Sequence, residues 1–543
     1  MIASELWNSL WNSHKKTKQL LTFSIPTKAE KLAEASEGYQ KSKKDLPPSY
    51  TTPQKIGLFL GPLLFILVAF FFSPQDLSQE GKMALAVTLW VATWWITEAL
   101  PIPATSLLPI VLLPITGALE GAKVTASYGD PNIFLFLGGF VIAIAMEKWE
   151  LHRRIALSII SFVGTSTSNI VLGFMLATGF ISMWVSNTAA VMMMLPIGTA
   201  ITYQVAQALK NNNSNESFAD EEMKFNKALL FAIGFSGSIG GVGTLIGTPP
   251  NTILAGVIKE LYGYQISFAE WMLFAMPVVI VLIFATWLYL TRVAFPIKLK
   301  HIPGGKELIH NEKKKLGKIR YEEGMVLVVF IFAAFMWITR TFLWQDIIPG
   351  ISDTMISITA AVLLFMIPAK NVGGRILDWA ACKDLPWGVL LLFGGGLAIA
   401  AGFKETGLAS WIGNQLTVLD GIHFIFILIA TTGLVLFLTE ITSNTATATM
   451  ILPALGALAL ALGVHPFALM VPAAMAATCA FMLPVGTPPN AIIFATGKIK
   501  IIEMVKTGFW INIFAWILIV VATYFLLPLI WNIDLTVFPS NFK

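Results

Sequence analysis

The stretch FISMWVSNTAAVMMMLP at residues 180–196 places an uncharged polar triplet, Ser-Asn-Thr, inside a long apolar run. A second stretch, LFLTEITSNTATATMILP at residues 436–453, carries the same triplet in a matching context. Each triplet is followed further along the chain by a second shared element, GTPPN, at residues 247–251 and 486–490. Two matched pairs in the same order indicate a duplicated site.

The composition of the 543 residues is typical of a membrane protein. Hydrophobic residues make up 56% and charged residues only 12% of the chain, about half the charged fraction of soluble domains. Apolar runs of about 20 residues recur, which predicts an all-α polytopic membrane protein rather than a barrel of short alternating strands. The two cysteines argue against a disulfide framework. We attribute the net charge of +5 to basic cytoplasmic loops and expect no nucleic-acid partner.

We expect eleven transmembrane helices and two longer apolar stretches that fold back on themselves. A helix over the 44 residues 165–208 would be about 66 Å long, twice the hydrocarbon thickness of about 30 Å. This stretch must therefore form two legs with a turn at the triplet, and the same holds for 422–463. The eleven spans are expected at 55–72, 83–98, 102–117, 133–156, 226–258, 269–291, 324–340, 353–368, 387–412, 466–497 and 507–531.

The distribution of Lys and Arg predicts the orientation of these spans. Basic residues gather in the loops 1–54, 148–164, 292–323, 369–386 and 498–506, whereas the loops expected on the other side hold at most one each. Because basic loops stay cytoplasmic, we expect a multi-pass protein of the plasma membrane with a cytoplasmic N-terminus and an extracellular C-terminus. This orientation also requires both folded stretches to return to their own side as re-entrant hairpins.

The sequence also contains an internal repeat. FLFLGGFVIAIA at 134–145 aligns with LLFGGGLAIAAG at 391–402 at an offset near 256, and the triplets are offset by 257. Spans two to six then match spans seven to eleven, and an odd number of crossings makes the two copies inverted, as in many secondary transporters. The expected organisation is a cytoplasmic tail at 1–54, a first span and loop at 55–82, a first repeat at 83–291 with its hairpin at 165–208, a basic cytoplasmic linker at 292–323, a second repeat at 324–531 with its hairpin at 422–463, and an extracellular tail at 532–543.

The triplets and the GTPPN elements supply the groups that ion and anion sites need. Non-helical backbone survives at membrane depth only where protein buries it or water reaches it. A hairpin tip frees N–H groups that favour an anion, and it frees carbonyl groups that hold Na⁺ together with hydroxyl and amide oxygens. The paired prolines of GTPPN break a helix. The simpler alternative is that GTPPN is a proline kink and that the triplets join helices by hydrogen bonds.

Two acidic residues lie at or near membrane depth, where a charge is costly. Glu98 lies beside prolines at a predicted cytoplasmic end, which favours an interfacial structural role. Glu440 lies three residues before the second triplet, where it either tunes the site or orients a leg of the hairpin. Neither predicted hairpin tip contains Lys or Arg, so dipoles, amides and bound cations would have to neutralise an anionic substrate.

The duplicated triplets, both GTPPN elements and the segment WWITEALPIPATSLLPIVLLP at 94–114 resemble one known family. It comprises the divalent anion–sodium symporters, which carry dicarboxylates, citrate or sulfate. The similarity runs from about residue 55 to the C-terminus and looks closest to the Gram-positive bacterial sodium/dicarboxylate symporters. The resemblance implies a homodimer in the bilayer with broken helices at the site, in which a transport domain moves against a scaffold like an elevator.

The resemblance also implies roles for individual residues, with Na⁺ as the coupling ion. Thr442 and the glycines would act through backbone oxygens. The family's sodium sites match Ser182, Ser186, Asn187 and Gly247 in the first half, and Thr439, Thr442, Asn444 and Gly486 in the second. The substrate site would comprise Ser186, Asn187, Thr188, Thr248, Ser443, Asn444, Thr445, Thr487 and Pro488.

We therefore expect a secondary transporter that imports C4-dicarboxylates, such as succinate, fumarate and malate, with two or more Na⁺ ions. The alternatives within the family are Na⁺-independent dicarboxylate exchange and transport of citrate or sulfate. Exchange is disfavoured because we would expect a basic side chain in place of sodium. An intramembrane enzyme or a pump subunit is a further alternative, but the chain has no G-x-x-x-x-G-K-[ST] phosphate loop and no H-E-x-x-H motif. We therefore expect that it is not an enzyme.

Overall fold

The computed structural model describes residues 50–164, 166–211, 216–297, 305–371, 373–415 and 421–542. Within these ranges the secondary structure is helical, and no described residue belongs to a strand. Seven helical segments of the described chain are long and apolar enough to cross a membrane. The prediction of an all-helical polytopic protein is confirmed. The predicted N-terminal tail lies outside the described residues up to residue 49.

The first two helices pack side by side. α3 (Thr52–Ile66) continues into the π-helical turn η1 (Leu67–Phe71), and α4 (Gln79–Thr97) runs back along it. The indole N–H of Trp94 donates to the carbonyl oxygen of Gly57 at 2.9 Å. A side chain at this glycine would collide with α4, so its absence permits the close approach.

The predicted span at 102–117 is divided into two short helices, α5 (Ile102–Thr105) and α6 (Leu108–Ile115). Pro103 and Pro109 each occupy the first turn of one helix. Proline is tolerated in a first turn but disrupts a helix interior. The same prolines that start both helices therefore prevent a single continuous one.

The predicted span at 133–156 also ends earlier than expected. α7 (Gly121–Ser127) leads into α8 (Pro131–Lys148), which stops before α9 (Leu151–Val163) begins. Between α8 and α9, Glu150 has a left-handed backbone with φ of 56°. A left-handed residue ends a helix, so α8 does not continue into α9.

The stretch with the first triplet is a helix–turn–helix. α10 (Thr167–Ser182) and α11 (Asn187–Asn211) are joined by a turn at 183–186. α10 packs closely against α12 (Glu216–Gly241). The two legs agree with the length argument, and the return of both legs to one side of the membrane stays a prediction.

The next apolar stretch is interrupted at the first GTPPN. After α12 the chain is non-helical over 242–248 and then enters α13 (Pro249–Tyr262). α14 (Phe268–Tyr289) follows and ends in the π-helical turn η2 (Leu290–Ala294). The interruption leaves the C-terminal end of α12 and the N-terminal end of α13 inside the protein.

The middle of the chain forms α15 (Gly305–Lys315), α16 (Tyr321–Thr339), η3 (Arg340–Trp344), α17 (Gln345–Ile347) and α18 (Asp353–Met366). α18 packs against α8 and α16. The predicted basic linker at 292–323 is described except for residues 298–304.

The predicted span at 387–412 is likewise two helices. The short 3₁₀ helix η4 (Trp379–Asp384) precedes α19 (Trp387–Glu405), and α20 (Leu408–Gln415) follows it. Gly407 separates α19 from α20 with φ of 70°, a left-handed conformation that glycine adopts without strain.

The helices around the second triplet and the second GTPPN follow the same order as those around the first. α21 (Phe424–Leu438) and α22 (Asn444–Ala461) form a helix–turn–helix around the second triplet. α23 (Phe467–Thr478) is then separated from α24 (Pro488–Ala495) by the non-helical residues 479–487.

The C-terminal helices of the described chain pack against helices from both halves. The described chain closes with α25 (Ile501–Val521), η6 (Ala522–Leu526), α26 (Leu527–Trp531) and η7 (Ser540–Phe542). α25 packs against α14, α21 and α23.

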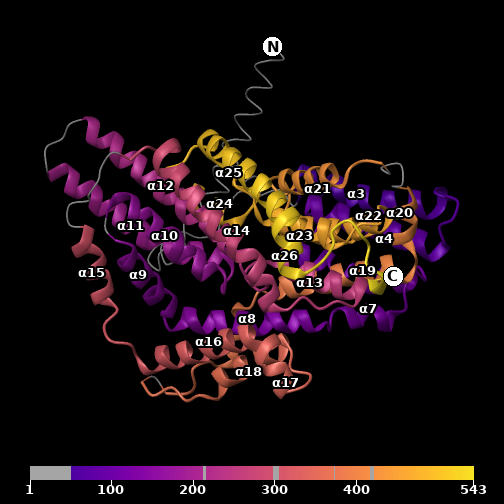
Figure 1. Cartoon of the computed structure of the whole chain (residues 1–543), viewed down its shortest axis with the longest axis horizontal. Coiled ribbons are helices and arrows are strands. Elements are labelled where there is room, and N and C mark those ends of the chain that lie inside the picture. The colour runs from indigo at the N-terminus through magenta and orange to yellow at the C-terminus, as the bar shows by residue number, and fades with distance from the viewer. Residues whose placement is uncertain are drawn as a thin grey trace, which may run out of the picture.

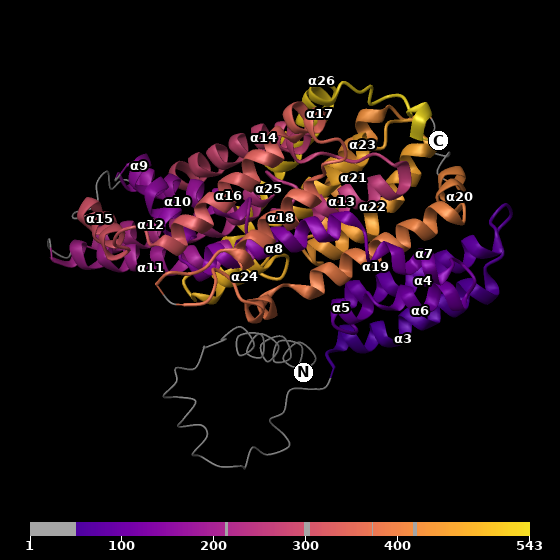
Figure 2. The same cartoon turned by 90° about the horizontal axis from the view of Figure 1, so that it is seen from below.

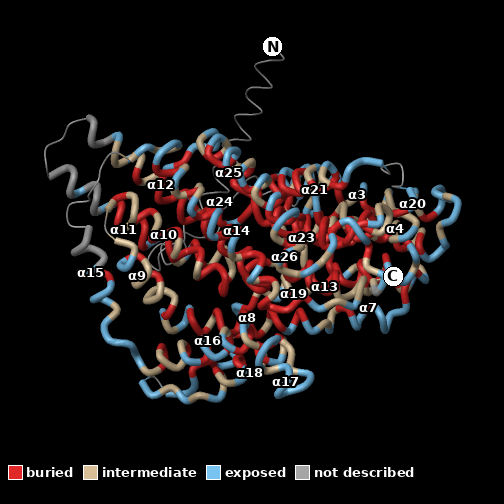
Figure 3. The backbone as a smooth tube through the Cα atoms, in the orientation of Figure 1, coloured by how far each residue is buried: buried red, intermediate tan, exposed pale blue. Residues whose placement is uncertain are grey.

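The helices form an elongated body (Figure 1). α9, α11, α12 and α15 lie at one end, whereas α4, α7 and α20 lie toward the other, and α16 and α18 lie along one long side. In the view turned by 90° (Figure 2), α3 to α7 form one corner of the molecule. Buried residues concentrate in the middle, around α13 and α23, and exposed residues gather on outer helices such as α7 and α20 (Figure 3).

Candidate functional site

Both turns and both interruptions face one cavity of about 480 Å³. All nine residues predicted for the substrate site line this cavity, although no interaction with a ligand is part of the structure. The lining residues outside the motifs are Glu98, Phe136, Phe140, Ile246, Pro386, Val389 and Val485. The motif residues that line it are Ser186, Asn187, Thr188, Gly247, Thr248, Pro249, Ser443, Asn444, Thr445, Gly486, Thr487, Pro488 and Pro489.

Four helices begin at this cavity. α11 and α22 begin at Asn187 and Asn444, and α13 and α24 begin at Pro249 and Pro488. The start of a helix carries a partial positive charge and unpaired N–H groups. Two of the four begin with Pro-Pro, which has no N–H, so the free donors come from α11 and α22. With no Lys or Arg among its described lining residues, the cavity has only helix dipoles, backbone N–H groups and side-chain hydroxyl and amide groups with which to attract an anion.

The side chain of Asn187 lies within a cluster of oxygens behind the first turn. The inner terminal atom of its amide is 2.7 Å from Ser182 Oγ, 3.1 Å from the carbonyl oxygen of Gly247 and 3.2 Å from that of Gly237. If this atom is the amide nitrogen, its two N–H groups can donate to two of these three oxygens. If it is the amide oxygen, the four oxygens form the donor set that a hard cation prefers. Oxygen and nitrogen of such an amide are assigned from their surroundings.

The side chain of Asn444 has equivalent surroundings behind the second turn. Its inner terminal atom is 2.7 Å from Thr439 Oγ1, 3.1 Å from the carbonyl oxygen of Gly486 and 3.1 Å from that of Ala477. The amide of Asn444 can therefore also present either its nitrogen or its oxygen to these three oxygens. Two copies of one oxygen arrangement occur in the two halves of the chain.

The two clusters bring together most of the predicted sodium residues. Ser186 instead caps α11, where its hydroxyl accepts from the N–H of Ala189 at 3.3 Å. The hydroxyl of Thr442 contacts Thr447 Oγ1 at 2.6 Å and donates to the carbonyl oxygen of Leu438 at 2.8 Å, while the role expected for Thr442 concerns its backbone oxygen and stays a prediction. The predicted residues that the clusters bring together are Ser182, Asn187, Gly247, Thr439, Asn444 and Gly486.

The last residue of each GTPPN holds the interrupted helix in place, a role that the sequence did not reveal. The buried amide of Asn251 donates to the carbonyl oxygens of Val242 and Thr244 at 3.1 and 2.8 Å. The buried amide of Asn490 donates to those of Ala480 and Leu483, both at 3.0 Å. Carbonyl groups freed by a break must find donors at membrane depth, and these two asparagines supply them.

The carboxylate of Glu440 holds the second interruption to the second turn. Glu440 is 3% exposed. Its oxygens accept from the backbone N–H groups of Phe481, Met482 and Leu483 at 2.7, 3.0 and 3.0 Å. The side-chain amide of Asn512 on α25 donates to it at 2.6 Å. Of the two roles open from the sequence, these contacts favour the orientation of the hairpin.

A contact between hydroxyl groups joins the two interruptions. Thr248 Oγ1 and Thr478 Oγ1 are 3.4 Å apart, and both side chains are buried. Thr248 follows Gly247 of the first oxygen cluster, and Thr478 follows Ala477 of the second. A contact between the residue that precedes α13 and the last residue of α23 therefore links the two clusters.

Comparisons with known proteins agree with this architecture. A family model described as the sodium:sulfate symporter transmembrane region matches residues 54–532. A sodium-dependent dicarboxylate transporter SdcS of Staphylococcus saprophyticus is 55% identical over 499 residues, which cover 91% of this chain and 95% of the relative. A protein of the same name from Staphylococcus aureus is 56% identical over 501 residues, which cover 92% of this chain and 95% of the relative.

Two solved structures share the fold at low sequence identity. The YdaH transporter of Alcanivorax borkumensis has a TM-score of 0.55 at 13% identity, covering 82% of this chain and 98% of its own. MtrF of Neisseria gonorrhoeae has a TM-score of 0.54 at 12% identity, covering 88% of this chain and 95% of its own. At these identities the likeness concerns the fold alone.

The similar curated sequences are named as transporters, in agreement with the prediction that the chain is not an enzyme. The matched region spans nearly all of the described helices, including both triplets and both GTPPN elements. The chain therefore belongs to the sodium:sulfate symporter family, the divalent anion–sodium symporters that its duplicated motifs resemble.

Proposed function

We propose that this chain is a secondary transporter that imports C4-dicarboxylates such as succinate, fumarate and malate together with two or more Na⁺ ions. The observation that carries the proposal is a pair of oxygen clusters beside a cavity where four helices begin and whose described lining residues include no Lys or Arg. The names of the similar staphylococcal proteins, sodium-dependent dicarboxylate transporters, support the same two cargoes.

The proposed coupling follows from charge. A dianion in this cavity would meet helix dipoles and N–H groups but no basic side chain, so its negative charge would be only partly neutralised. Na⁺ ions in the two oxygen clusters would add the missing positive charge beside each turn. Each turn would then bind one carboxylate of the substrate. The substrate contacts would be Asn187, Thr188, Asn444 and Thr445, with Ser186, Ser443, Thr248, Thr487 and Pro488 close by.

We also propose how the protein is arranged in the membrane. The two helix–turn–helix units would be re-entrant hairpins in inverted repeats of a homodimer in the plasma membrane, with the N-terminus cytoplasmic. Glu98 and Pro386 line the cavity and lie at predicted cytoplasmic ends, so the cavity would open toward the cytoplasm in this state. The elements around the cavity would then move as an elevator between the two sides.

Uptake into proteoliposomes tests the proposed cargoes. Radiolabelled succinate would be supplied outside with an inward gradient of Na⁺, of K⁺ or of choline. We expect uptake only with Na⁺, and equal uptake in all three would rule out sodium coupling. Uptake that requires dicarboxylate inside the vesicles would instead indicate exchange. Competition by unlabelled fumarate, malate, citrate and sulfate would identify the preferred anion.

Removing the hydroxyl of Ser182 or Thr439 is expected to weaken Na⁺ binding more than substrate binding. Each hydroxyl is buried, lies 2.7 Å from the asparagine of its cluster and supplies one of four oxygens. Loss of one interaction with an ion is worth about 1.5–3 kcal/mol. Ser182→Ala and Thr439→Val should therefore raise the Na⁺ concentration for half-maximal uptake about tenfold or more.

Thr178→Ala is the matched control for these variants. Thr178 is a buried hydroxyl residue on α10, and it donates to Phe174 within the helix at 2.7 Å. Its loss should leave the Na⁺ dependence unchanged. A shift of equal size in Thr178→Ala would show that the effect comes from α10 as a whole and not from the oxygen cluster.

An ion pair between α13 and the start of α8 is expected to stabilise the state in which the cavity opens toward the cytoplasm. Lys259 on α13 binds Asp130 at the start of α8 at 2.7 Å, and Lys404 on α19 donates to the carbonyl oxygen of Glu260 at 2.6 Å. If α13 slides against α8 and α19 during transport, both contacts must break. The partly buried ion pair is worth about 1 kcal/mol, so Asp130→Asn should shift the population of states about fivefold.

Labelling of a cysteine at Val485 measures this shift. Val485 lines the cavity and is 80% exposed, and Cys382 and Cys479 would be replaced by serine in every variant. Asp130→Asn should lower labelling by an impermeant maleimide from the cytoplasmic side, and exchanging the charges of Lys259 and Asp130 should restore it. Glu405→Gln, which breaks the exposed pair with Lys123, should have no effect. An unchanged rate in Asp130→Asn would contradict the sliding of α13 past α8.

A further inference from the structure

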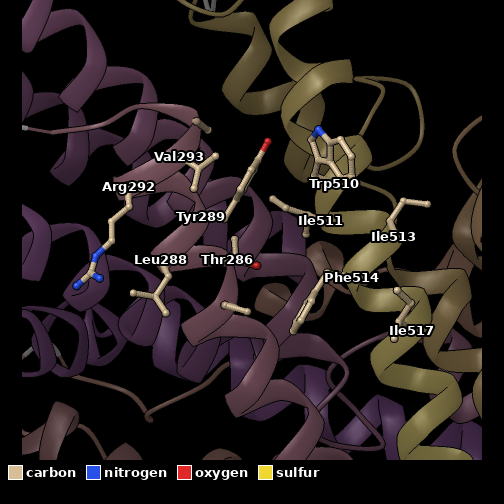
Figure 4. A pocket seen from close by; sticks show the side chains of 12 residues that line it. Thr286, Leu288, Tyr289, Arg292, Val293, Trp510, Ile511, Ile513, Phe514 and Ile517 are labelled. Carbon is tan, nitrogen blue, oxygen red and sulfur yellow. The ribbon is translucent and has the colours of Figure 1, made fainter.

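An open groove separates α14 and η2 from α25 on the outside of the molecule (Figure 4). Its volume is about 810 Å³. Leu288 and Val293 form one wall, and Phe514 and Ile517 form the other. Val293 and Ile517 are 69% and 56% exposed. In a membrane-spanning protein, such a groove is apolar and open to the hydrocarbon of the bilayer.

One end of the groove is polar and positively charged. A second cavity of about 630 Å³ continues it through Tyr289 and Trp510 to Lys506. The carboxylate there, Glu503, is paired with Lys227 at 2.6 Å. Lys506 and Arg292 are exposed, and neither takes part in an ion pair or a side-chain hydrogen bond among the described residues. This end of the groove therefore carries two cations that no carboxylate of the described chain neutralises.

Polar groups point toward the same end of the groove. Figure 4 shows the hydroxyl of Tyr289 and the indole nitrogen of Trp510 directed toward its upper end, whereas the guanidinium of Arg292 extends on the outer side of α14. One helical turn deeper, Thr286 lines the groove. Its side chain is 2% exposed, and its hydroxyl has no hydrogen-bond partner among the described residues. This hydroxyl is enclosed by protein atoms, so it does not offer a hydrogen bond to a molecule in the groove.

The order of these groups matches the parts of a phospholipid. Lys506 and the two aromatic donors lie at the mouth, Arg292 borders the groove from the outer side of α14, and apolar side chains line the rest. The mouth belongs to the loops expected on the cytoplasmic side, where anionic lipids are concentrated and where basic pockets between helices bind their headgroups. We propose that the groove between α14 and α25 holds one anionic phospholipid of the cytoplasmic leaflet. Its phosphate would lie near Lys506, with Arg292 at the edge of the site, and an acyl chain would lie between Phe514 and Leu288.

Thermal unfolding of the delipidated full chain in detergent tests the headgroup preference. Phosphatidylglycerol and phosphatidylcholine with identical acyl chains would be added separately. We expect phosphatidylglycerol to raise the Tm more. In the double variant Arg292→Gln/Lys506→Gln this excess should disappear, while the response to phosphatidylcholine stays. Equal shifts by both lipids in the unmodified chain would overturn the proposal.

A second pair of cations provides the matched control. Lys318 and Arg375 are exposed, lie in predicted cytoplasmic loops and form no ion pair among the described residues. Lys318→Gln/Arg375→Gln removes the same charge but should keep the full excess for phosphatidylglycerol. If it loses as much as the groove variant, the preference reflects net charge alone, and the groove is not the site.

Filling the groove tests its position independently of charge. Ala285 lines it and is half-buried, so Ala285→Phe should occupy the space of an acyl chain. Native mass spectrometry should then detect one fewer retained phosphatidylglycerol per chain, with an unchanged oligomeric mass. An unchanged lipid count overturns the proposal. So does a variant that dissociates into smaller oligomers, because the groove would then be an interface between chains.

Discussion

Asn187→Ala and Asn444→Ala are each expected to reduce the initial rate of substrate uptake by about 100-fold or more. Each asparagine touches three other oxygens and begins a helix at the cavity. Truncation removes a ligand of the proposed ion and a donor for a substrate carboxylate. Hydrogen bonds to charged groups are worth about 1.5–3 kcal/mol each, so the loss of two accounts for such an effect. Uptake by equal amounts of reconstituted protein provides the measurement.

Asn187→Asp separates the two proposed roles of this residue. The variant keeps an oxygen in the cluster and adds a negative charge, so Na⁺ binding measured by calorimetry should be retained or strengthened. Uptake should still be lost, because the added charge repels the substrate carboxylate. If Asn187→Asp loses Na⁺ binding as fully as Asn187→Ala, the amide nitrogen is the group that matters, and the cluster is a structural hydrogen-bond network.

Asn169→Ala is the control for both asparagine variants. This residue lies on α10 at the far end of the same helix–turn–helix, and its amide donates to the carbonyl oxygen of Val163 at 3.1 Å. The substitution removes a similar amide and a similar hydrogen bond without touching the cavity. Uptake within about twofold of the unmodified chain is expected. A large loss would show that the hairpin tolerates no truncation of this kind.

The meeting of the triplets and the GTPPN elements at one cavity was predictable from sequence, whereas the backbone oxygens of Gly237 and Ala477 in the two clusters were not. The triplets and GTPPN elements are side-chain signals, and the cavity collects all of them. The carbonyl oxygens of Gly237 and Ala477 belong to the clusters as well. A backbone carbonyl has the same chemistry at every residue, so its role depends on where a helix is interrupted and leaves no pattern in the sequence.

Glu440→Ala is expected to destabilise the protein strongly and to abolish transport. The substitution leaves three backbone N–H groups and the amide of Asn512 without their acceptor in a buried site. Each unsatisfied buried group costs about 1–3 kcal/mol, which gives a total of several kcal/mol. The expected result is a large decrease in Tm in detergent, or failure to accumulate as folded protein. Thermal unfolding followed by size-exclusion chromatography measures both.

Two further variants, Glu440→Gln and Met183→Leu, test whether the loss of stability in Glu440→Ala comes from the missing acceptor. Glutamine keeps one oxygen acceptor, so Glu440→Gln should lower the Tm less than Glu440→Ala does. Met183 occupies the corresponding place in the first turn and contributes its backbone carbonyl oxygen, which accepts from Thr244 at 2.5 Å. Met183→Leu should therefore be tolerated. Wild-type stability in Glu440→Ala would contradict the role assigned to the carboxylate.

Hydropathy predicted an all-helical polytopic protein but not the residues at which several of its helices end. The expected spans at 102–117, 133–156 and 387–412 each contain two helices. The residues on both sides of each helix break are apolar or mixed. The hydropathy averaged over about 20 residues is therefore that of one span. The breaks depend on single residues with special backbone conformations, such as Glu150 and Gly407. The order of helices and the two-legged stretches, in contrast, follow from length and composition over many residues.

The contact between Thr248 and Thr478 has a consequence for how the protein responds to ion concentration. Because it joins the side chains of the residues that follow Gly247 and Ala477 in the two clusters, we expect order imposed by the first ion to reach the second cluster. Such linkage is reciprocal and produces positive cooperativity, with a Hill coefficient for Na⁺ above one. Thr248→Val would remove the hydroxyl and reduce that coefficient toward one. The protein would then respond gradually, rather than steeply, to the sodium concentration outside the cell.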